Sequence, residues 1–382
     1  MRLAGPRSTR LSRVVALAVL ATLAVVAYVS RVQYEMRDFQ VYWEGGRRVL
    51  AAESLFRAED GHYVFKYLPA FAIAVAPWSL LPLRAAQAVW FGLSVIGLTF
   101  VLQSSARLLP GRRRPTWLLV VAAIVALGKF YGHELVLGQV NLAVTALAIG
   151  ALGAFRRNRD GWAGALLGAS VAVKPYGIIL LPYLVVTRQR RAAACLASVV
   201  VAALVAPVVA YGPSGAVEQH RLWLATIVGS TPSTLVTQDN ISLFAMFGKW
   251  FGVGPIAWSL GFLSVAVMVG LVALVIARRP ASEAVYLEIA LLLMLVPIVS
   301  PQGWDYMLVM ATPAVMLVVD RIDRLPRALG VSVGLALLAM GLSLFDVLGR
   351  TAYAAVMRWS LVTICALVIV AGVGVLRNRR LA

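Results

Sequence analysis

Asp38 lies eight residues beyond the end of a first apolar stretch at 11–30, in a chain of 382 residues. A carboxylate held there, just outside a membrane, could act as a general base toward a hydroxyl group. It could instead cap a helix that begins at this point, because aspartate side chains accept backbone N–H bonds at helix starts. Both interpretations require a helix directly after the first apolar stretch.

Lys174 precedes Pro175 at the junction of two short apolar stretches. A lysine at the centre of a bilayer costs ~2.5–3.5 kcal/mol, so such a residue often has a function. One interpretation is a side chain that extends along a broken helix to reach the membrane surface. The other is an ammonium group that faces a phosphate, a role that suits a compact point charge.

The segment LGQVN places Gln139 and Asn141 within the apolar segment at 135–155, shortly after the polar pair His133 and Glu134. Amides in such positions can hydrogen-bond neighbouring helices together, or they can contact a substrate. The His133–Glu134 pair is typical of polar residues at a membrane interface. The amides are therefore the candidates for substrate contact in this region.

Trp304 and Asp305 begin another apolar stretch, within the segment SPQGWDY. A tryptophan at the end of a span usually belongs to the aromatic belt of a membrane protein. An aspartate beside it is less expected there, and it could contact a substrate at the membrane surface.

Several motifs of catalysis are missing from the chain. It has no Walker sequence, Gly-rich dinucleotide loop, G-x-S-x-G, HExxH, paired Cys/His spacing or D-x-D pair. Each of these would serve a nucleotide, a metal ion or a catalytic serine. We therefore expect no metal, no cofactor and no soluble nucleotide donor.

The composition favours an integral membrane protein. Hydrophobic residues make up 61% of the chain and charged residues only 13%, which suits lipid rather than water as the solvent. We expect an all-α transmembrane bundle of about 11–13 spans, folded as a single domain over residues 1–382. Its apolar segments run at 11–30, 68–83, 85–104, 116–130, 135–155, 162–173, 175–187, 192–211, 256–277, 284–300, 304–319, 327–345 and 355–376.

The arginines predict which loops lie in the cytoplasm. The net charge is +19, and the basic residues form short runs between apolar segments, which is the positive-inside pattern of a membrane protein rather than a nucleic-acid surface. Charge-balanced loops at 31–67 and 212–255 then lie outside the cytoplasmic membrane, with both termini inside and an uncleaved signal anchor at the start. One inconsistency remains, because two apolar segments, 68–83 and 85–104, separate the outer loop at 31–67 from Arg112–Arg114. One of these segments must fail to cross, or the arginine loop is an exception.

The first of these loops has the pattern of an amphipathic helix. From Asp38 onward, Phe39, Tyr42, Gly46 and Val49 recur at helical spacing with charged residues between them. We expect this helix to lie on the membrane surface, held by its aromatic side chains. A second helix is expected within 212–255, at 220–227.

The order of these segments resembles glycosyltransferase family 87, a mannosyltransferase-like group of the GT-C superfamily. The resemblance covers nearly the whole chain and rests on a dozen-span profile with seven short segments. They are DFxxY from Asp38, FKYLPAF from Phe65, the WSLLPL turn from Trp78, GQVN from Gly138, the Lys174–Pro175 pair, DNISL from Asp239 and SPQGW from Ser300.

The resemblance implies a bundle of GT-C type that transfers a sugar, typically mannose, from a polyprenyl-phosphate donor to a hydroxyl of a glycan or glycolipid acceptor. It implies transfer at the outer face of the membrane, with inversion and with Asp38 as the catalytic base. Lys66 and Lys174 are candidates to stabilise the departing lipid phosphate. The matching segments supply the other candidate substrate-binding residues, Tyr67, Gln139, Asn141, Asn240, Gln302 and Trp304, and Asp305, directly after SPQGW, is a further candidate.

Two alternatives remain open at this point. The same chemistry could use another lipid-linked sugar, such as arabinofuranose or glucose, which hydropathy does not distinguish. A transporter of lipids or solutes could line its pathway with Lys174, Gln139 and Asn141. The chain lacks the internal repeat that transporters usually show, which favours the transferase.

Overall fold

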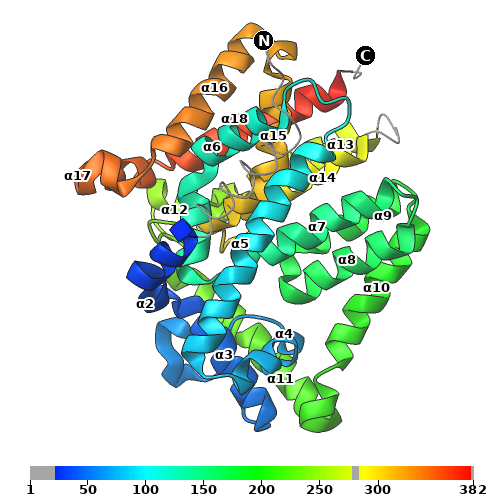
Figure 1. Ribbon diagram of the computed structural model, residues 1–382, viewed down its shortest axis with the longest axis vertical. Coiled ribbons are helices and arrows are strands. Elements are labelled where there is room, and N and C mark those ends of the chain that lie inside the picture. The colour runs from blue at the N-terminus through cyan, green and yellow to red at the C-terminus, as the bar shows by residue number, and fades with distance from the viewer. Residues whose placement is uncertain (1–21, 278–283, 380–382) are drawn as a thin grey trace, which may run out of the picture.

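The computed structural model describes residues 22–277 and 284–379 (Figure 1). Within these ranges the chain is helical, and its one β-type contact is an isolated antiparallel bridge between Asn240 and Trp304. The all-α prediction is therefore confirmed. Half of the predicted signal anchor, residues 11–21, lies outside the described residues, as does the Arg278–Arg279 pair.

The described helices fit a multi-pass membrane protein. Four of them are long and apolar enough to cross a membrane: α5 (Leu83–Arg107), α6 (Thr116–Leu137), α13 (Pro255–Ala277) and α18 (Leu361–Asn378). Two further pairs qualify when each is taken as one bent segment. They are α10 (Arg190–Val205) with α11 (Val208–Thr234), bent by 86°, and α16 (Arg327–Leu342) with α17 (Phe345–Arg358), bent by 107°.

Shorter apolar helices complete the bundle. They are α7 (Asn141–Phe155), α8 (Asp160–Val173), α9 (Leu180–Val186) preceded by a 3₁₀ turn from Pro175, and α14 (Val285–Val299). At 1.5 Å per residue each is shorter than a hydrocarbon core of about 30 Å. The predicted number of 11–13 spans therefore stays a prediction.

The centre of the bundle is helix α14, which is apolar on every side. Its residues from Tyr286 to Ile298 are all buried, together with those of α15 (Thr312–Asp320). Glu288 is the charged residue of α14, and it accepts hydrogen bonds from Arg377 (2.6 Å) and Tyr183 (2.9 Å). A buried carboxylate needs such partners, so these bonds tie α14 to α18 and α9.

The region between α3 (Arg37–Leu50) and α5 bears on the inconsistency in the predicted topology. Residues 69–80 form α4 (Pro69–Val75) and a 3₁₀ turn (Ala76–Leu80), only about 18 Å in length. They pack on α3, where Ser79 Oγ donates a hydrogen bond of 2.6 Å to the Trp43 carbonyl. This segment is shorter than a hydrocarbon core of about 30 Å, which favours the alternative in which it does not cross and α5 is the crossing helix between the 31–67 loop and Arg112–Arg114.

Helix α3 confirms the predicted amphipathic helix, but its apolar face packs against protein rather than lipid. Phe39 is 0% and Tyr42 1% exposed, and both rings contact Trp90 of α5. The predicted role of these aromatics as membrane anchors is therefore wrong. Covering the apolar face with α4 and α5 fixes α3 in place, which a lipid surface would not do. The second predicted helix, at 220–227, lies within α11.

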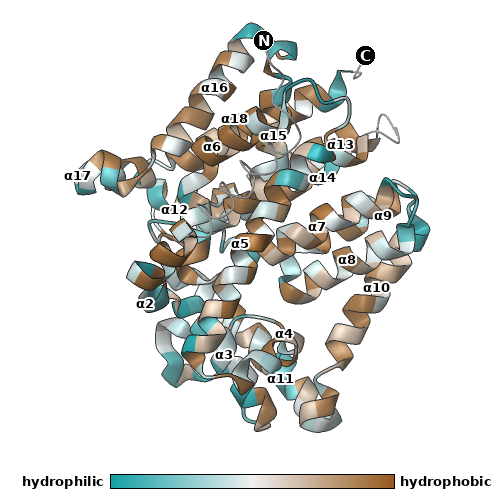
Figure 2. Cartoon of the chain, viewed as in Figure 1, coloured by the Kyte–Doolittle hydropathy of each residue, from teal (hydrophilic) through white to brown (hydrophobic). Residues whose placement is uncertain are grey.

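Hydropathy along the chain agrees with this arrangement. Figure 2 shows hydrophobic residues along α5, α7, α8 and α10, with hydrophilic residues gathered at α3 and at the connection between α9 and α10. That connection contains Arg188, Arg190 and Arg191. The hydrophilic residues thus mark two separate ends of the bundle, as the charge pattern predicts.

Labelling of single cysteines should report the two sides of the membrane. In a background without Cys195 and Cys365, Ser233→Cys in the 212–255 loop should react with a membrane-impermeant thiol reagent in intact cells. Gln189→Cys, in the arginine-rich connection, should react only after the cells are permeabilised, because positively charged loops stay inside. Labelling of Gln189→Cys but not of Ser233→Cys in intact cells would show that the true topology is the inverse of the predicted one.

Candidate active site

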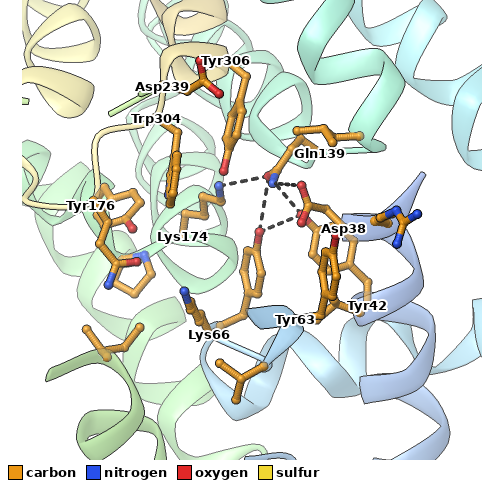
Figure 3. Close-up of a pocket in the computed structure, with 18 of the residues that line it drawn as sticks. Asp38, Tyr42, Tyr63, Lys66, Gln139, Lys174, Tyr176, Asp239, Trp304 and Tyr306 are labelled. Atoms are coloured by element: carbon orange, nitrogen blue, oxygen red, sulfur yellow. Dashed lines mark hydrogen bonds between the residues drawn. The ribbon is translucent and has the colours of Figure 1, made fainter. Parts of the chain in front are cut away.

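A cavity of about 450 Å³ lies where α3, α6 and α11 meet the segments at 63–67, 174–176 and 302–306 (Figure 3). This volume lies within the range of small-molecule sites. Seven predicted site residues line it: Asp38, Lys66, Tyr67, Gln139, Lys174, Gln302 and Trp304. Segments far apart in the sequence therefore converge on one cavity.

Asp38 is the second residue of α3, in its first turn. The N-cap position is Met36, and no side chain caps the helix, so the capping interpretation of Asp38 is wrong. The carboxylate instead accepts a hydrogen bond of 2.7 Å from Nε2 of Gln139. The positive end of the helix dipole favours a carboxylate at this position. Gln139 thus sets the direction of the Asp38 carboxyl group at the cavity wall.

Gln139 joins the two sides of the cavity through its amide. Its Oε1 atom accepts hydrogen bonds from Tyr42 (3.0 Å) and from Lys174 Nζ (3.3 Å), while its Nε2 atom donates to Asp38. Gly138 places it there by ending α6 in the left-handed conformation, at φ +69°. A Cβ at Gly138 would lie 2.8 Å from Phe39 Cβ, so only glycine allows α3 to approach this closely.

Lys174 is buried, with 6% of its surface exposed. It follows α8 in extended conformation, a break that Pro175 enforces, and its Nζ donates a hydrogen bond of 2.8 Å to Oδ1 of Asn141. The rings of Tyr67 and Tyr306 lie 5.4 and 5.8 Å from Nζ, within range of cation–π attraction. The ammonium group therefore faces the cavity and does not reach for the membrane surface.

A second buried charge balances Lys174 behind the cavity wall. Glu134 is 1% exposed and accepts a hydrogen bond of 2.7 Å from Nδ2 of Asn141. Asn141 therefore lies between the carboxylate and the ammonium, with one bond to each. The sequence indicated Glu134 as an interface residue, but the end of α6 is enclosed by other helices.

Lys66 gives the cavity another cationic group. It lies in the segment before α4, and the indole of Trp223 on α11 donates a hydrogen bond of 3.3 Å to its carbonyl. Burial lowers the pKa of the Lys66 ammonium, and the Asp38 carboxylate partly offsets this effect. Figure 3 shows Lys66 and Lys174 approaching the same space from different segments, across from Asp38.

The remaining wall is built from DNISL and SPQGW, which pair with each other. Around the Asn240–Trp304 bridge, Ile241 N donates to Gly303 O at 2.7 Å and Asp305 N donates to Asp239 O at 2.8 Å. The Asn240 side chain is fully buried and donates a bond of 2.8 Å to the Pro301 carbonyl. This pairing presents Trp304 to the cavity, stacked on Tyr306 with ring centroids 6.2 Å apart.

Asp305 lies behind this wall, fully buried, and outside the lining of the cavity. Its carboxylate contacts Lys129 Nζ at 3.1 Å and His133 Nδ1 at 2.8 Å. Lys129 also donates to Tyr353, which in turn donates to Asp239. Substrate contact by Asp305, Asn141 and Asn240 stays a prediction, and their observed bonds hold the wall in place.

Several lining residues were not predicted from the sequence. Arg37 and Tyr63 come from the 31–67 loop, His133 from the end of α6, and Trp223 from α11. Tyr42 and Asp239 belong to the quoted segments, so closer attention to those segments would have found them. Nothing in the sequence marks Tyr63 or Trp223, because each reaches the cavity only through the packing of loops.

Asp305→Asn should destabilise the fold, because it leaves the poorly exposed Lys129 ammonium without its carboxylate. Breaking one partner of a buried ion pair typically costs about 3–5 kcal/mol, so the melting temperature in detergent should fall clearly. Asp323→Asn is the matched control, since Asp323 pairs with Arg113 at the surface and exposed pairs contribute little. Equal melting temperatures for the two variants would contradict the structural role of Asp305.

The fold and the cavity define a multi-pass helical membrane protein that holds a carboxylate across from buried ammonium groups in one site. Residues 65–301 match glycosyltransferase family 87, and the chain belongs to that family. Asp38 lies before the matched residues. The resemblance seen in the sequence is thereby confirmed at the level of the family.

A relative from Mycobacterium tuberculosis (strain ATCC 25618 / H37Rv) is a polyprenol-phosphate-mannose-dependent alpha-(1-2)-phosphatidylinositol mannoside mannosyltransferase. It is 28% identical to this chain over 218 residues, which cover 52% of this chain and 49% of the relative. The match therefore spans about half the length of each protein. No solved structure matches the chain.

Proposed function

We propose that this protein is a glycosyltransferase that moves mannose from a polyprenyl-phosphate donor to an acceptor hydroxyl. The observation that carries the proposal is the cavity, in which the Asp38 carboxylate and the Lys174 ammonium both contact Gln139. Group transfer from a phosphate needs a base for the incoming hydroxyl and a cation for the leaving group. The cavity supplies both within one site.

In the proposed reaction, Asp38 accepts the proton of the acceptor hydroxyl as its oxygen bonds to the anomeric carbon. The bond from that carbon to the phosphate oxygen breaks on the opposite face of the ring, and both of its electrons leave with the polyprenyl phosphate. The anomeric centre inverts, so a β-linked donor gives an α-linked product. One carboxylate suffices as the base, because the phosphate leaves as an anion that needs no general acid and inversion needs no second carboxylate as nucleophile.

The cationic groups suit a lipid phosphate. Lys174 and Lys66 would neutralise the charge that develops on the leaving group, in a site that protein and lipid shield from water. Gln302 and the Trp304 ring would contact the donor sugar from the wall opposite Asp38. Lys174 donates to amide oxygens of Gln139 and Asn141 in the structure, so Asn141 separates its ammonium from Glu134 and the side toward the cavity can still meet an anion.

The charge of the loops supports a proposal for the side of the membrane on which the cavity opens. Segments of both the 31–67 and 212–255 loops line the cavity, and in each of these loops the basic residues are matched by an equal number of acidic ones. By the positive-inside rule, the cavity would then open at the outer face of the cytoplasmic membrane, and the termini would be cytoplasmic. A lipid-linked donor suits that location, where soluble nucleotide sugars are not supplied.

A donor panel tests the proposal. Purified protein in lipid nanodiscs would receive polyprenyl-phosphate mannose, glucose or arabinofuranose, with and without glycan and glycolipid acceptors, and release of polyprenyl phosphate would be measured. We expect acceptor-dependent release from the mannose donor. Release from another donor alone would show that the transferred sugar is not mannose. No release from any donor, in a protein that still melts cooperatively, would overturn the proposal.

A further inference from the structure

A second hollow of about 290 Å³ lies beside the cavity, along one stripe of α3. We call it the α3 recess. Arg37, Gln40, Glu44 and Arg48 recur there at intervals of three or four residues, so they share one face of the helix. Asp60 and Tyr63, from the loop that follows, form its opposite wall.

The recess is continuous with the cavity on the side of Asp38. Arg37, Val41 and Tyr63 line both spaces. Arg37 precedes Asp38 in the chain, and Val41 lies one turn further along the same helix. A molecule held in the recess would therefore reach the cavity beside the Asp38 carboxylate, across from the Lys174 ammonium.

The charges of the recess balance each other and are held in fixed pairs. Arg48 binds Asp60 in a two-pronged ion pair, with contacts of 2.5 and 2.7 Å, and Arg47 donates two hydrogen bonds to Glu44. The bonds from Arg47 lower the pKa of Glu44, so it remains a carboxylate. The charged residues that line the recess are Arg37 and Arg48 against Glu44 and Asp60, so the formal charges of its lining sum to zero, which favours a neutral ligand over an anionic one.

The chemistry of the lining suits a polyhydroxylated ligand. Carboxylates and guanidinium groups offer acceptors and donors for vicinal hydroxyls. The Tyr63 ring, 43% exposed and 5.8 Å from the Arg37 guanidinium, offers a flat apolar face for the C–H side of a sugar ring. The acyl chain of a lipid would find few apolar contacts on such a charged wall.

We propose that the α3 recess binds the neutral sugar part of the acceptor and directs one of its hydroxyls to Asp38. This assignment rests on the proposed transferase function and extends it, because it places the acceptor on the α3 side and the donor phosphate on the Lys174 side. The acceptor hydroxyl then approaches the anomeric carbon from the side of Asp38, and the phosphate leaves on the side of Lys174. The two groups lie on opposite faces of that carbon, as inversion requires.

Two variants test the recess, each with a matched control. Glu44→Gln and Tyr63→Ala alter the recess, whereas Glu53→Gln and Tyr34→Ala make the same changes elsewhere. Glu53 forms an exposed ion pair with Arg57, and Tyr34 lies 5.5 Å below the Arg84 guanidinium. With mannobiose as acceptor probe and polyprenyl-phosphate mannose as donor, each recess variant should raise the acceptor KM about tenfold. The donor KM should stay unchanged, and the controls should match the wild type.

Direct binding separates failure of the recess from failure of the transferase proposal. Saturation-transfer NMR of the wild type should show mannobiose bound, with the signal lost in Tyr63→Ala and kept in Tyr34→Ala, whether or not transfer occurs. A wild-type acceptor KM in both recess variants, or a mannobiose signal that survives in Tyr63→Ala, would overturn the assignment. Displacement of mannobiose by inorganic phosphate at equal concentration would also overturn it, because it would show an anion site.

Discussion

Asp38→Asn should lower the rate of transfer at saturating donor by about 10²–10⁴-fold and leave donor binding intact. The amide can keep a hydrogen bond with Gln139, which now holds the Asp38 carboxylate at 2.7 Å, so the local structure should survive. It cannot accept the proton of the acceptor hydroxyl. The measurement is turnover in nanodiscs, with the melting temperature and the donor KM recorded alongside.

Two further variants sharpen this result. Asp38→Glu keeps the base but displaces it by about one C–C bond, so partial activity is expected. Asp346→Asn is the matched control, because Asp346 is also the second residue of its helix, α17. A loss of melting temperature that came only from the helix dipole would occur in both asparagine variants. Turnover near the wild-type value in Asp38→Asn would refute its role as the base.

Lys174→Ala should weaken donor binding about 10- to 150-fold, which corresponds to the ~1.5–3 kcal/mol of a hydrogen bond to a charged group. The buried ammonium donates to Asn141 and Gln139 and faces the cavity, so its loss removes the cation nearest the proposed phosphate. Lys174→Arg should restore binding only in part, because a planar guanidinium does not replace a compact ammonium. Donor affinity, measured by titration with polyprenyl phosphate, reports the effect.

The effect of Lys174→Ala on stability needs a separate control, because Lys174 and the buried Glu134 both form hydrogen bonds with the side chain of Asn141. Removing the ammonium alone leaves a buried carboxylate without its counter-charge, which destabilises a fold. The double variant Glu134→Gln, Lys174→Met removes both charges and should recover much of the melting temperature. If it also recovers donor affinity, Lys174 acts only in folding.

The sequence predicted those parts of the site that depend on local chemistry. Asp38 begins an amphipathic helix whose period is visible in the residues, and the break at Pro175 follows from the missing N–H of proline. In each case the signal lies within a few neighbouring residues, so the prediction did not need the rest of the fold.

Other features depend on contacts between distant segments and could not be predicted. An apolar transmembrane helix shows no preferred face, so nothing indicated that the His133 end of α6 turns inward to meet Asp305. The same reason hid the packing of Phe39 and Tyr42 against α5, since lipid and protein interiors both suit aromatic side chains. The contribution of Trp223 depends on the course of the long 212–255 loop.

The bridge between Asn240 and Trp304 has a consequence for biosynthesis. Ribosomes add about 5–20 residues per second, so roughly 60 residues of intervening chain delay the partner of Asn240 by about 3–13 s. During that interval Asp38 and Lys174 have already been translated, yet the cavity wall that Trp304 completes is missing, and the Asn240 amide lacks the Pro301 carbonyl. The cavity is therefore among the last parts of the protein to form. A nonsense mutation just before Ser300 would give a chain that holds its base and its cation but has no enclosed site in which to use them.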